Sequence, residues 1–506
     1  MQNYHRHSCY SNIFVPDSAA TNEEYAKRAK ELGHKIISSV EHGWQGYYFE
    51  TYELAKKYNL KFVFGAEAYW VKDRKKEYEV FDSETKEVKK DKDGTIVKQK
   101  DKKNCHVILL AKNENGRQAI NSILSTANID GYYFKPRVDL ELLLSLPSND
   151  VFVTTACIAF WQYDDSEEIV QKLYNHFGNN LMLEIQYHNT KSQIELNKKI
   201  LYLSKKYNIK MIVGLDSHYI YESDSWKRDY ILETKKVHYD DEEGWYMDYP
   251  SDDIVFQRFK EQQVFSDSEI REAMDNTDIA LSFDDYDNVN IFTKNIKLPT
   301  LYPNLTKEEK DNLYGRLITK KYKEYIKEIP KEEQKKYFDG VKKEVQTYKD
   351  TGMTDYPLLD YEIVKDAVNH GGLITNTGRG SAVGYFTNTL CGFSKVDRFK
   401  SAIKLYPERF ISKTRILETH SLPDIDLNVG TPEIFEQAQI NVLGRNHVYP
   451  MIAFGTLKKK AAFKLYAKAQ GLDFSIANKI TDEIGKYDEA LKYAEDDEKD
   501  TIDLYD

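Results

Sequence analysis

The stretch Tyr4-His5-Arg6-His7-Ser8 opens the chain with two histidines separated by a single residue. Seven further side chains of the metal-binding type are scattered after it: Asp17, His42, Glu67, His106, Cys157, Asp216 and His218. Imidazole, carboxylate and thiolate groups are the ligands of zinc, manganese and iron sites. Most of these residues follow a short apolar run, so strands would deliver them to one end of a barrel. The pattern predicts a metal-assisted hydrolytic centre there.

Short apolar runs and helical patterns alternate over residues 1–225. Helices are expected over 22–32, with Asn22 as a candidate cap, and over 190–207. Repeated strand–helix alternation favours parallel strands with right-handed crossovers, and therefore an α/β barrel or an open α/β sheet. The expected strands lie near 2–7, 36–40, 61–69, 105–111, 151–155, 181–186 and 210–215.

The rest of the chain differs in composition. Residues 72–104 are rich in Lys, Glu and Asp around the turn Lys92-Asp93-Gly94, which predicts a solvated surface hairpin. Residues 226–300 are acidic and are expected to form helical connecting structure. Pro299 marks a boundary, and charged helical patterns follow it. We therefore divide the chain into residues 1–225, 226–300, 301–431 and 432–506.

Bulk properties exclude some classes of protein. The chain has 506 residues, of which 41% are hydrophobic and 30% charged, as expected for several ordinary globular domains. No apolar run approaches the roughly 20 residues that a membrane helix needs, and the first residues do not resemble a signal peptide. Four cysteines without paired spacing favour the reducing cytoplasm. The net charge of −10 argues only weakly against nucleic acid, because local basic surface decides such binding.

Each metal-type residue alone has a structural explanation, such as a hydrogen-bonded interior histidine or a small buried cysteine. The order of the nine, however, resembles the polymerase-and-histidinol-phosphatase (PHP) family of phosphoesterases. The resemblance rests on His5-Arg6-His7, on Glu41-His42-Gly43 and on Asp216-Ser217-His218, with Glu41 in place of the family's usual aspartate. It implies a distorted (β/α)7 barrel in which all nine residues hold two or three divalent ions: zinc, manganese or iron.

Such a cluster would suit the hydrolysis of phosphate esters. The reaction needs charge neutralisation on the phosphoryl oxygens and a hydroxide nucleophile at neutral pH, and clustered divalent ions supply both. Asp17 or Glu67 could bridge neighbouring ions, while the histidines bind as neutral ligands and Cys157 as a thiolate.

A second set of residues lies between 377 and 428. The glycine-rich stretch Thr377–Gly384 would let backbone N–H groups approach a phosphate. In Leu422–Asn428, Asp424 and Asp426 share one face of a strand and could hold two magnesium ions. Taken alone, a tight turn and a polar edge strand are the commoner explanations of such sequences.

Together the two motifs resemble the bacterial replicative DNA polymerase III α subunit family, the C family, which also carries an N-terminal PHP domain. Gly378-Arg379-Gly380-Ser381, Pro423–Asp426 and Phe454–Lys458 carry the resemblance. It implies a polymerase-β-like nucleotidyltransferase palm, present in part, followed by a helical thumb. Gly378, Arg379, Gly380 and Ser381 would then bind the triphosphate, and Asp424 and Asp426 the catalytic magnesium. DNA would be bound by the thumb residues Lys458, Lys460 and Lys464.

The resemblance implies template-directed DNA synthesis in the full protein and a metal-dependent 3′–5′ exonuclease in the PHP domain. Primer–template DNA and deoxynucleoside triphosphates would be its substrates, in the cytoplasm of a bacterial cell or of a phage-infected host. We expect the third palm aspartate, the fingers and the C-terminal region to lie beyond Asp506. A sliding clamp or other replisome proteins would bind through those regions, and the 506-residue chain alone is not expected to polymerise.

Two other functions remain open from the residues. A stand-alone PHP phosphoesterase with an inert palm remnant would release phosphate from nucleotides or small esters without extending a primer. A non-catalytic scaffold stabilised by its metal cluster would lose melting temperature on chelation and would hydrolyse nothing.

Overall fold

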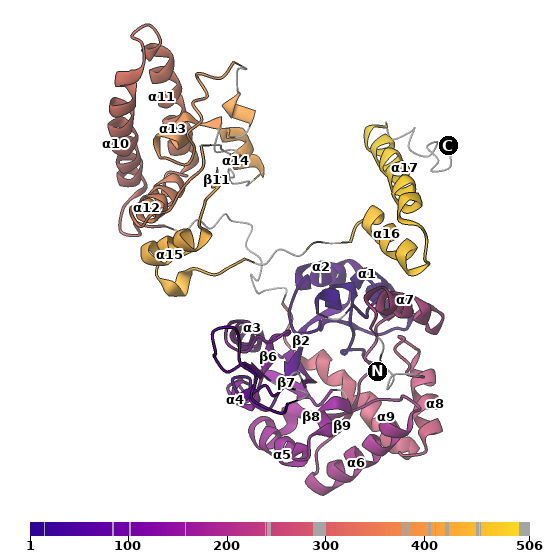
Figure 1. The fold of residues 1–506 in the computed structure, drawn as a ribbon. Coiled ribbons are helices and arrows are strands. Elements are labelled where there is room, and N and C mark those ends of the chain that lie inside the picture. Colours follow the sequence, from indigo (N-terminus) through magenta and orange to yellow (C-terminus); the bar gives the residue numbers. More distant parts are fainter. Residues whose placement is uncertain are drawn as a thin grey trace. The chain divides into compact units, whose positions relative to one another are not determined.

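The computed structural model describes the whole chain except residues 15, 83–84, 101–102, 157, 238, 240–243, 287–299, 377–378, 381–383, 403–405, 410, 420–424, 452–454, 456 and 495–506. The chain forms two compact units (Figure 1). The first comprises Met1–Ile291 and Thr456–Asp506, and the second comprises Phe292–Gly455.

A seven-stranded sheet forms the centre of the first unit, with helices packed around the outside of its strands (Figure 1). Its main path runs in the order β1 (Ile36–Ser39), β2 (Lys61–Trp70), β5 (Cys105–Ala111), β7 (Val151–Thr154), β8 (Leu181–Ile185) and β9 (Met211–Val213), and β6 (Arg137–Val138) pairs with β2. These strands are buried almost throughout, as their apolar sequences require. The α/β class and six of the seven expected strands are confirmed.

The seventh expected strand, near 2–7, is wrong. Within the described residues 1–14, sheet-type pairing is confined to one parallel bridge between Arg6 and Ser217. The amide of His7 donates to Ser217 O at 2.8 Å, and the amide of Ser217 donates to His5 O at 3.3 Å. The N-terminal segment therefore lies beside the chain that leaves β9, and the two ligand-type histidines flank the bridge.

The expectation of parallel strands is also wrong at β5, which runs antiparallel to both β2 and β7. The reason lies in the connection, because a parallel return needs a crossover such as a helix. The chain between β2 and β5 instead forms the predicted surface hairpin, with β3 (Glu77–Glu79) paired to β4 (Lys98–Lys100) and Gly94 in its turn. One consequence is that the start of β5, at His106, lies beside the end of β2, at Tyr69.

The helices of the first unit follow the expected pattern with small differences. Helix α1 (Asn22–Glu31) is capped by Thr21 rather than by Asn22, because Thr21 and Glu24 form a reciprocal capping box. The region after residue 225 is helical, as predicted. The other helices are α2 (Tyr48–Tyr58), α3 (Glu114–Ile129), α4 (Leu140–Leu144), α5 (Ser166–Phe177), α6 (Lys191–Tyr207), α7 (Ser225–Lys235), α8 (Asp252–Gln262), α9 (Asp267–Asp275), α16 (Lys459–Ala469) and α17 (Phe474–Tyr493).

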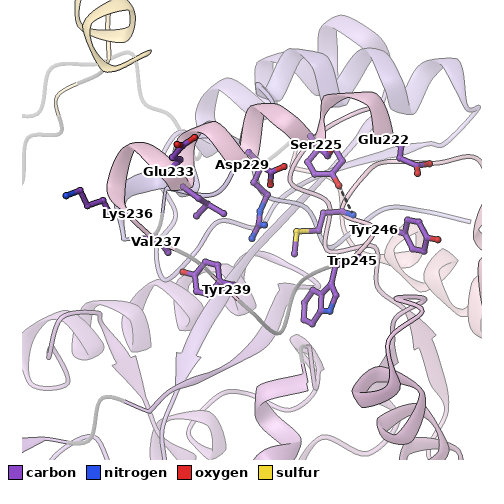
Figure 2. Close-up of a pocket in the computed structure, with 14 residues that line it drawn as sticks. Glu222, Ser225, Asp229, Glu233, Lys236, Val237, Tyr239, Trp245 and Tyr246 are labelled. Atoms are coloured by element: carbon purple, nitrogen blue, oxygen red, sulfur yellow. Dashed lines mark hydrogen bonds between the residues drawn. The ribbon is translucent and has the colours of Figure 1, made fainter. Parts of the chain in front are cut away.

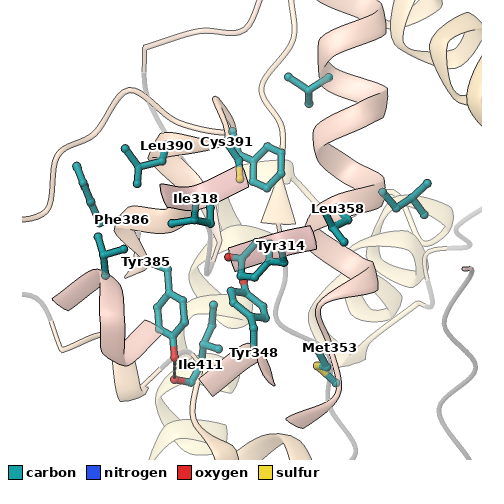
Figure 3. Close-up of a cluster of buried hydrophobic side chains, with 14 of the residues drawn as sticks. Tyr314, Ile318, Tyr348, Met353, Leu358, Tyr385, Phe386, Leu390, Cys391 and Ile411 are labelled. Carbon is teal, nitrogen blue, oxygen red and sulfur yellow. Dashed lines mark hydrogen bonds between the residues drawn. The ribbon is translucent and has the colours of Figure 1, made fainter. Parts of the chain in front are cut away.

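The second unit is mainly helical. Its core is an aromatic cluster in which Tyr348 packs edge-on against Tyr314 and Tyr385 (Figure 3). The hydroxyl of Tyr385 donates to Ile411 O at 3.0 Å, and that of Tyr348 to Oδ1 of Asn388 at 3.3 Å. Its elements are α10 (Lys307–Tyr325), α11 (Gln334–Thr351), α12 (Asp355–Asn369), β10 (Arg379–Gly380), α13 (Phe386–Leu390), α14 (Lys413–Thr419), β11 (Ile425–Asp426) and α15 (Pro432–Leu443).

Short 3₁₀ turns complete the description: η1 (Cys9–Ile13), η2 (Ile158–Gln162), η3 (Gly178–Asn180), η4 (Glu222–Asp224), η6 (Asn276–Ser282), η7 (Ile326–Glu328), η9 (Pro407–Arg409) and η10 (Arg445–His447). Among the described helices, none is both long enough and apolar enough to cross a membrane.

Candidate metal centre

Eight of the nine ligand-type residues are described, and the fold brings all eight into one cluster; Cys157 lies outside the described residues. The cluster draws on the N-terminal segment, the chain that leaves β1, strand β2, the start of β5 and the chain that leaves β9. Asp216 has a φ of +46°, and Ala156, next to Cys157, has a φ of +44°. Left-handed backbone at non-glycine residues is strained and concentrates at functional sites.

Glu67 lies in the middle of the cluster and is fully buried. Its Oε1 lies 2.7 Å from Nδ1 of His42 and 2.8 Å from Nδ1 of His106. Its Oε2 lies 3.1 Å from Nε2 of His5 and 3.2 Å from Nε2 of His7. Each oxygen of one carboxylate thus faces two imidazoles, which is the arrangement expected of a carboxylate that bridges two ions.

Two aspartates lie on the other side of the imidazoles. Oδ1 of Asp216 lies 3.2 Å from Nε2 of His7 and 3.3 Å from Nε2 of His218. Oδ1 of Asp17 lies 3.4 Å from a ring nitrogen of both His218 and His42. The rings of His7 and His42 stack with their centroids 3.9 Å apart, so the histidines form a compact layer between the carboxylates.

Two overlapping groups could each hold an ion with ligand atoms within 4.8 Å of one another. They are His7, His42 and His218, and His5, His7, Glu67 and Asp216. Nε2 of His7, Nε2 of His42 and Oδ1 of Asp17 are buried, and although charged neighbours lie 3.2 to 3.4 Å away, none of them meets these atoms with hydrogen-bond geometry. Buried polar atoms are rarely left unsatisfied in folded proteins, so their exceptions need an explanation such as a bound ion. The donor set therefore fits divalent metal ions.

Charge pairing dominates the electrostatics of the cluster. Burial opposes ionisation, yet the neighbouring histidines outweigh it and hold the pKa values of Asp17, Glu67 and Asp216 well below the ordinary range. Burial likewise opposes the charged form of His218, but Asp17 and Asp216 raise its pKa to about 9. His7 differs, since burial and the adjacent His42 lower its pKa. Metal-free, the cluster is held together by protons that an ion would displace.

Glu184 supports the cluster from β8, and the sequence analysis did not single it out. Its Oε1 lies 2.7 Å from Nδ1 of His5, and its Oε2 accepts hydrogen bonds from Tyr4 Oη at 2.9 Å and Thr154 Oγ1 at 2.7 Å. A Cβ at Gly214 would lie 1.9 Å from Oε1 of Glu184, so glycine is required for this approach. An acid inside the apolar run 181–186 was the available signal, because a buried carboxylate needs partners.

Glu41, which stands where the family usually has aspartate, positions two of the segments that carry ligand-type histidines. It accepts hydrogen bonds from the amide and hydroxyl of Ser8, at 3.1 and 2.6 Å, and from the hydroxyl of Ser11 at 2.5 Å. The hydroxyl of Ser11 in turn accepts the amide of His42 at 3.1 Å. The longer acid therefore ties the two histidine-bearing segments together.

The first unit has a cavity of about 990 Å³ between α7 and the chain around Trp245 (Figure 2). Its lining includes Tyr219, which directly follows the ligand-type His218, and the amides of both residues donate to Met247 O. Figure 2 shows α7 as one wall, with Tyr239 and Trp245 across from it. The cavity is large enough for a small-molecule or nucleotide ligand.

In the second unit, the two palm-type motifs lie side by side. Strands β10 and β11 pair antiparallel, with Arg379 opposite Asp426 and Gly380 opposite Ile425. Asp426 is exposed. Of the other palm residues predicted to act, Gly378, Ser381 and Asp424 lie outside the described residues, and only the backbone of Arg379 is described.

Of the three thumb lysines, Lys458 and Lys460 lie at the beginning of α16 and Lys464 in its middle. Lys458 is its N-cap and is exposed, as is Lys460, while Lys464 is half-buried against the ring of Phe474. Cations at a helix N-terminus oppose the helix dipole, so this arrangement leaves a basic end available for an anion.

Comparison with known proteins gives two family matches. Residues 3–188 match the family described as PHP domain, and residues 313–506 match the one described as bacterial DNA polymerase III alpha NTPase domain. The chain thus joins a region of the PHP type to a region of the polymerase type. Specifically, both regions are similar to parts of bacterial DNA polymerase III alpha subunits, which confirms the resemblance stated from the sequence.

Its curated relatives are named DNA polymerase III subunit alpha. The protein from Aquifex aeolicus is 26% identical over 501 residues, covering 94% of this chain and 40% of its own. The Borreliella burgdorferi protein is 27% identical over 497 residues, covering 94% and 39%. The chain therefore spans about two fifths of the length of these relatives. Among solved structures, an amidohydrolase from Chromobacterium violaceum aligns at a TM-score of 0.28 and 12% identity, over 43% of this chain and 87% of its own, too weakly to support an argument.

Proposed function

We propose that the first unit is a metal-dependent 3′–5′ exonuclease that removes mispaired nucleotides, and that the second contributes to nucleotidyl transfer by a DNA polymerase III alpha type of enzyme. The gathering of eight ligand-type residues in one cluster around Glu67, seven of the eight being buried, carries the proposal for the first unit. Two family matches in the order of DNA polymerase III alpha subunits support the combination.

The residues of the cluster would divide the work as follows. His7, His42 and His218 would hold one ion, and His5 and Asp216 another, with Glu67 between them. Bound divalent ions supply phosphate-charge neutralisation and a hydroxide at neutral pH. The donor set accepts zinc, manganese or iron. The cavity lined by Tyr219 and Trp245 would receive the terminal nucleotide, and burial of the cluster would exclude bulk water.

The exonuclease is tested with a primer carrying a labelled, mispaired 3′ nucleotide. The purified chain is stripped with a chelator, reloaded with manganese, zinc or iron, and assayed for release of the label. We expect metal-dependent release that His7→Ala abolishes, with DNA affinity nearly unchanged. The exposed His370 provides the control variant His370→Ala, which should retain full activity.

Two other outcomes identify the alternatives. Chelator-sensitive hydrolysis of a small phosphomonoester without release from the primer would indicate a stand-alone phosphoesterase. A lower melting temperature on chelation, with no hydrolysis in any metal, would make the cluster a structural one.

For the second unit, we propose that Asp426 holds magnesium together with Asp424, and that Gly378–Ser381 bind the triphosphate. The antiparallel pairing of Arg379 with Asp426 supports this, because it lays the phosphate-binding motif beside the metal-binding motif. The test is magnesium-dependent binding of a deoxynucleoside triphosphate by calorimetry. Asp426→Asn should abolish the magnesium dependence, while Glu332→Gln, at another exposed acid of this unit, should not.

We further propose that Lys458, Lys460 and Lys464 contact the phosphates of primer–template DNA. Such contacts are independent of base sequence and weaken with salt. Replacing Lys458 and Lys460 with glutamine should lower affinity for all duplexes. A plot of the logarithm of affinity against the logarithm of salt concentration should become less steep by about two, because two phosphate contacts are lost. An unchanged slope would argue against this role.

A further inference from the structure

Two exposed aromatic residues near the metal centre have left-handed backbones. Tyr47 has a φ of +59° and is 40% exposed, and Phe134 has a φ of +61° and is 64% exposed. This conformation is costly for any residue with a side chain, and glycine normally occupies it. Neither ring is buried in the core. The fold therefore tolerates strain at two positions while presenting an aromatic ring to solvent at each.

Tyr47 lies on the chain that leaves the ligand-type His42. Its ring stacks on that of Tyr10, with centroids 3.7 Å apart and planes 10° apart. Trp44 packs edge-on against Tyr47, and its Nε1 donates to Tyr10 O at 3.1 Å. Three rings thus fix this segment, and Tyr47 is held in place without being covered.

Phe134 lies at the tip of the loop 131–137. The amide of Tyr133 donates to Lys135 O at 3.0 Å, which closes the tip. The buried Arg137 secures its base, because Nε donates to Gly131 O at 2.8 Å and Nη2 to Arg74 O at 2.8 Å. The loop is therefore anchored in the domain.

Both segments meet beside the metal centre. A Cβ at Gly43 would lie 2.6 Å from the ring of Tyr69 and 3.2 Å from Pro136, so the chain after His42 contacts the loop that bears Phe134. The ring of Tyr69 packs against the ligand-type His106, with centroids 5.2 Å apart. Nζ of Lys135 lies 4.2 Å above the same Tyr69 ring. Lys135 and the two segments that carry the exposed rings accordingly lie beside Tyr69, which packs on the centre.

We propose that Tyr47, Phe134 and Lys135 form a binding site for single-stranded nucleic acid, in which unpaired bases stack on the two rings and Lys135 contacts the backbone phosphate. This inference rests on the proposed exonuclease and names the path by which its substrate reaches the metal centre. Aromatic stacking beside a basic side chain is how proteins bind single strands without reading their sequence. The positive charge of Lys135 between the two segments favours a polyanion as the ligand over an apolar protein surface.

The deciding variant is Phe134→Gly. Glycine adopts a φ of +61° without strain, so this change should leave the melting temperature equal or higher while it removes the ring. A loss of binding could then not be attributed to unfolding. Tyr47→Gly is the second variant, and Tyr202→Ala is the matched control, since Tyr202 is 58% exposed on α6 away from these loops.

Binding is measured by fluorescence anisotropy with a labelled oligo-dT and with an abasic oligonucleotide of equal length. The His7→Ala background prevents cleavage during the titration. We expect each glycine variant to lose roughly five- to hundredfold affinity for oligo-dT, as removal of one stacking ring predicts. The abasic strand should bind the parent weakly, and each variant should reduce the difference in affinity between the two strands.

The proposed single-strand site is refuted if the variants bind oligo-dT as the parent does, or if the parent binds both strands equally. If the variants change self-association of the protein and leave DNA affinity unchanged, the surface is a protein interface, and the proposed single-strand site is again refuted. Failure of the exonuclease is seen separately, because it leaves the primer uncut while the difference between oligo-dT and the abasic strand persists. If the primer is cleaved but the variants bind DNA like the parent, only the proposed single-strand site is refuted and the exonuclease stands.

Discussion

Nδ1 of His5 lies 2.7 Å from Oε1 of Glu184, and both side chains are fully buried. The opposite nitrogen of the same ring, Nε2, lies 3.1 Å from Glu67 and 3.2 Å from Asp216. A histidine that donates one N–H to a carboxylate has its other nitrogen fixed as an acceptor and made more basic. Glu184 therefore orients His5 toward the position that an ion would occupy.

We predict that Glu184→Gln lowers the affinity of the centre for divalent metal by about 10- to 100-fold without unfolding the domain. Glutamine can still accept from Tyr4 and Thr154, but it cannot balance the charge of a metal-bound His5. Competition with a chromophoric chelator measures the affinity, and Glu195→Gln on the exposed face of α6 is the control. Equal affinities for the two variants would count against a positioning role of Glu184.

Gly214 tests the same relationship sterically. A Cβ there would lie 1.9 Å from Oε1 and 2.7 Å from Cγ of Glu184. We expect Gly214→Ala to displace the carboxylate, to weaken metal binding in the same direction, and to destabilise the first unit by about 1–3 kcal/mol, as overpacking does. Thermal unfolding followed by tryptophan fluorescence reports this unit, because Trp44, Trp70, Trp161, Trp226 and Trp245 all belong to it. An unshifted transition would show that the approach is looser than described.

The pKa of His218, raised to about 9, predicts opposite pH dependences for the metal-free and metal-loaded protein. A raised pKa in the folded state stabilises the fold fully below the unfolded value of about 6.5, and this stabilisation is lost as pH rises through about 9. The melting temperature of the chelated protein should therefore fall between pH 6.5 and 9.5.

Metal binding should respond in the other direction. An ion must displace the proton of His218, so affinity should rise about tenfold per pH unit below pH 9 for each proton released. Titrations with manganese at several pH values measure this slope. A metal affinity independent of pH would mean that His218 is not a ligand.

The sequence pattern predicted the strands well because each is a buried apolar run of strand length. It failed at β5: the surface hairpin before this strand was predicted, but strand periodicity does not tell that β5 runs antiparallel to β2. That reversal is also what brings His106, at the start of β5, to the Glu67 end of β2. Glu184 escaped notice because its partners, Tyr4, Thr154 and His5, come from distant parts of the chain.

The palm motifs illustrate a different limit. Arg379 and Asp426 are opposite each other in the β10–β11 pair, although 46 positions separate them in the sequence. Neither a glycine-rich turn nor two alternating acids indicates which other segment it pairs with. Only the family resemblance therefore predicted that these two motifs belong to one site. Antiparallel contact continues outside the strands, where the amide of Thr375 donates to Asn428 O at 2.9 Å.

The last prediction concerns an ion pair buried in the second unit, which sequence patterns did not reveal. Glu344 on α11 is 2% exposed. It accepts from Nε and Nη2 of Arg398 at 2.9 and 2.5 Å, and from the amide of Thr387 at 2.8 Å. Burial raises the pKa of Glu344, with Arg398 opposing the shift. Removal of Arg398 leaves the buried charge of Glu344 unpaired. We therefore expect Arg398→Leu to lower the free energy of unfolding by about 3–5 kcal/mol at pH 7.5.

The deficit should shrink as pH falls toward 5.5. Without Arg398 the folded-state pKa of Glu344 rises further above its unfolded value, so protonation stabilises the folded form at lower pH. In urea unfolding, far-UV circular dichroism reports both units and tryptophan fluorescence only the first, so a shift seen by circular dichroism alone belongs to the second unit. Glu344→Gln combined with Arg398→Leu should recover part of the loss, since no charge is then left buried. A double variant as unstable as Arg398→Leu would show that the arginine contributes by packing on Phe399, 4.1 Å from its guanidinium, rather than by pairing with Glu344.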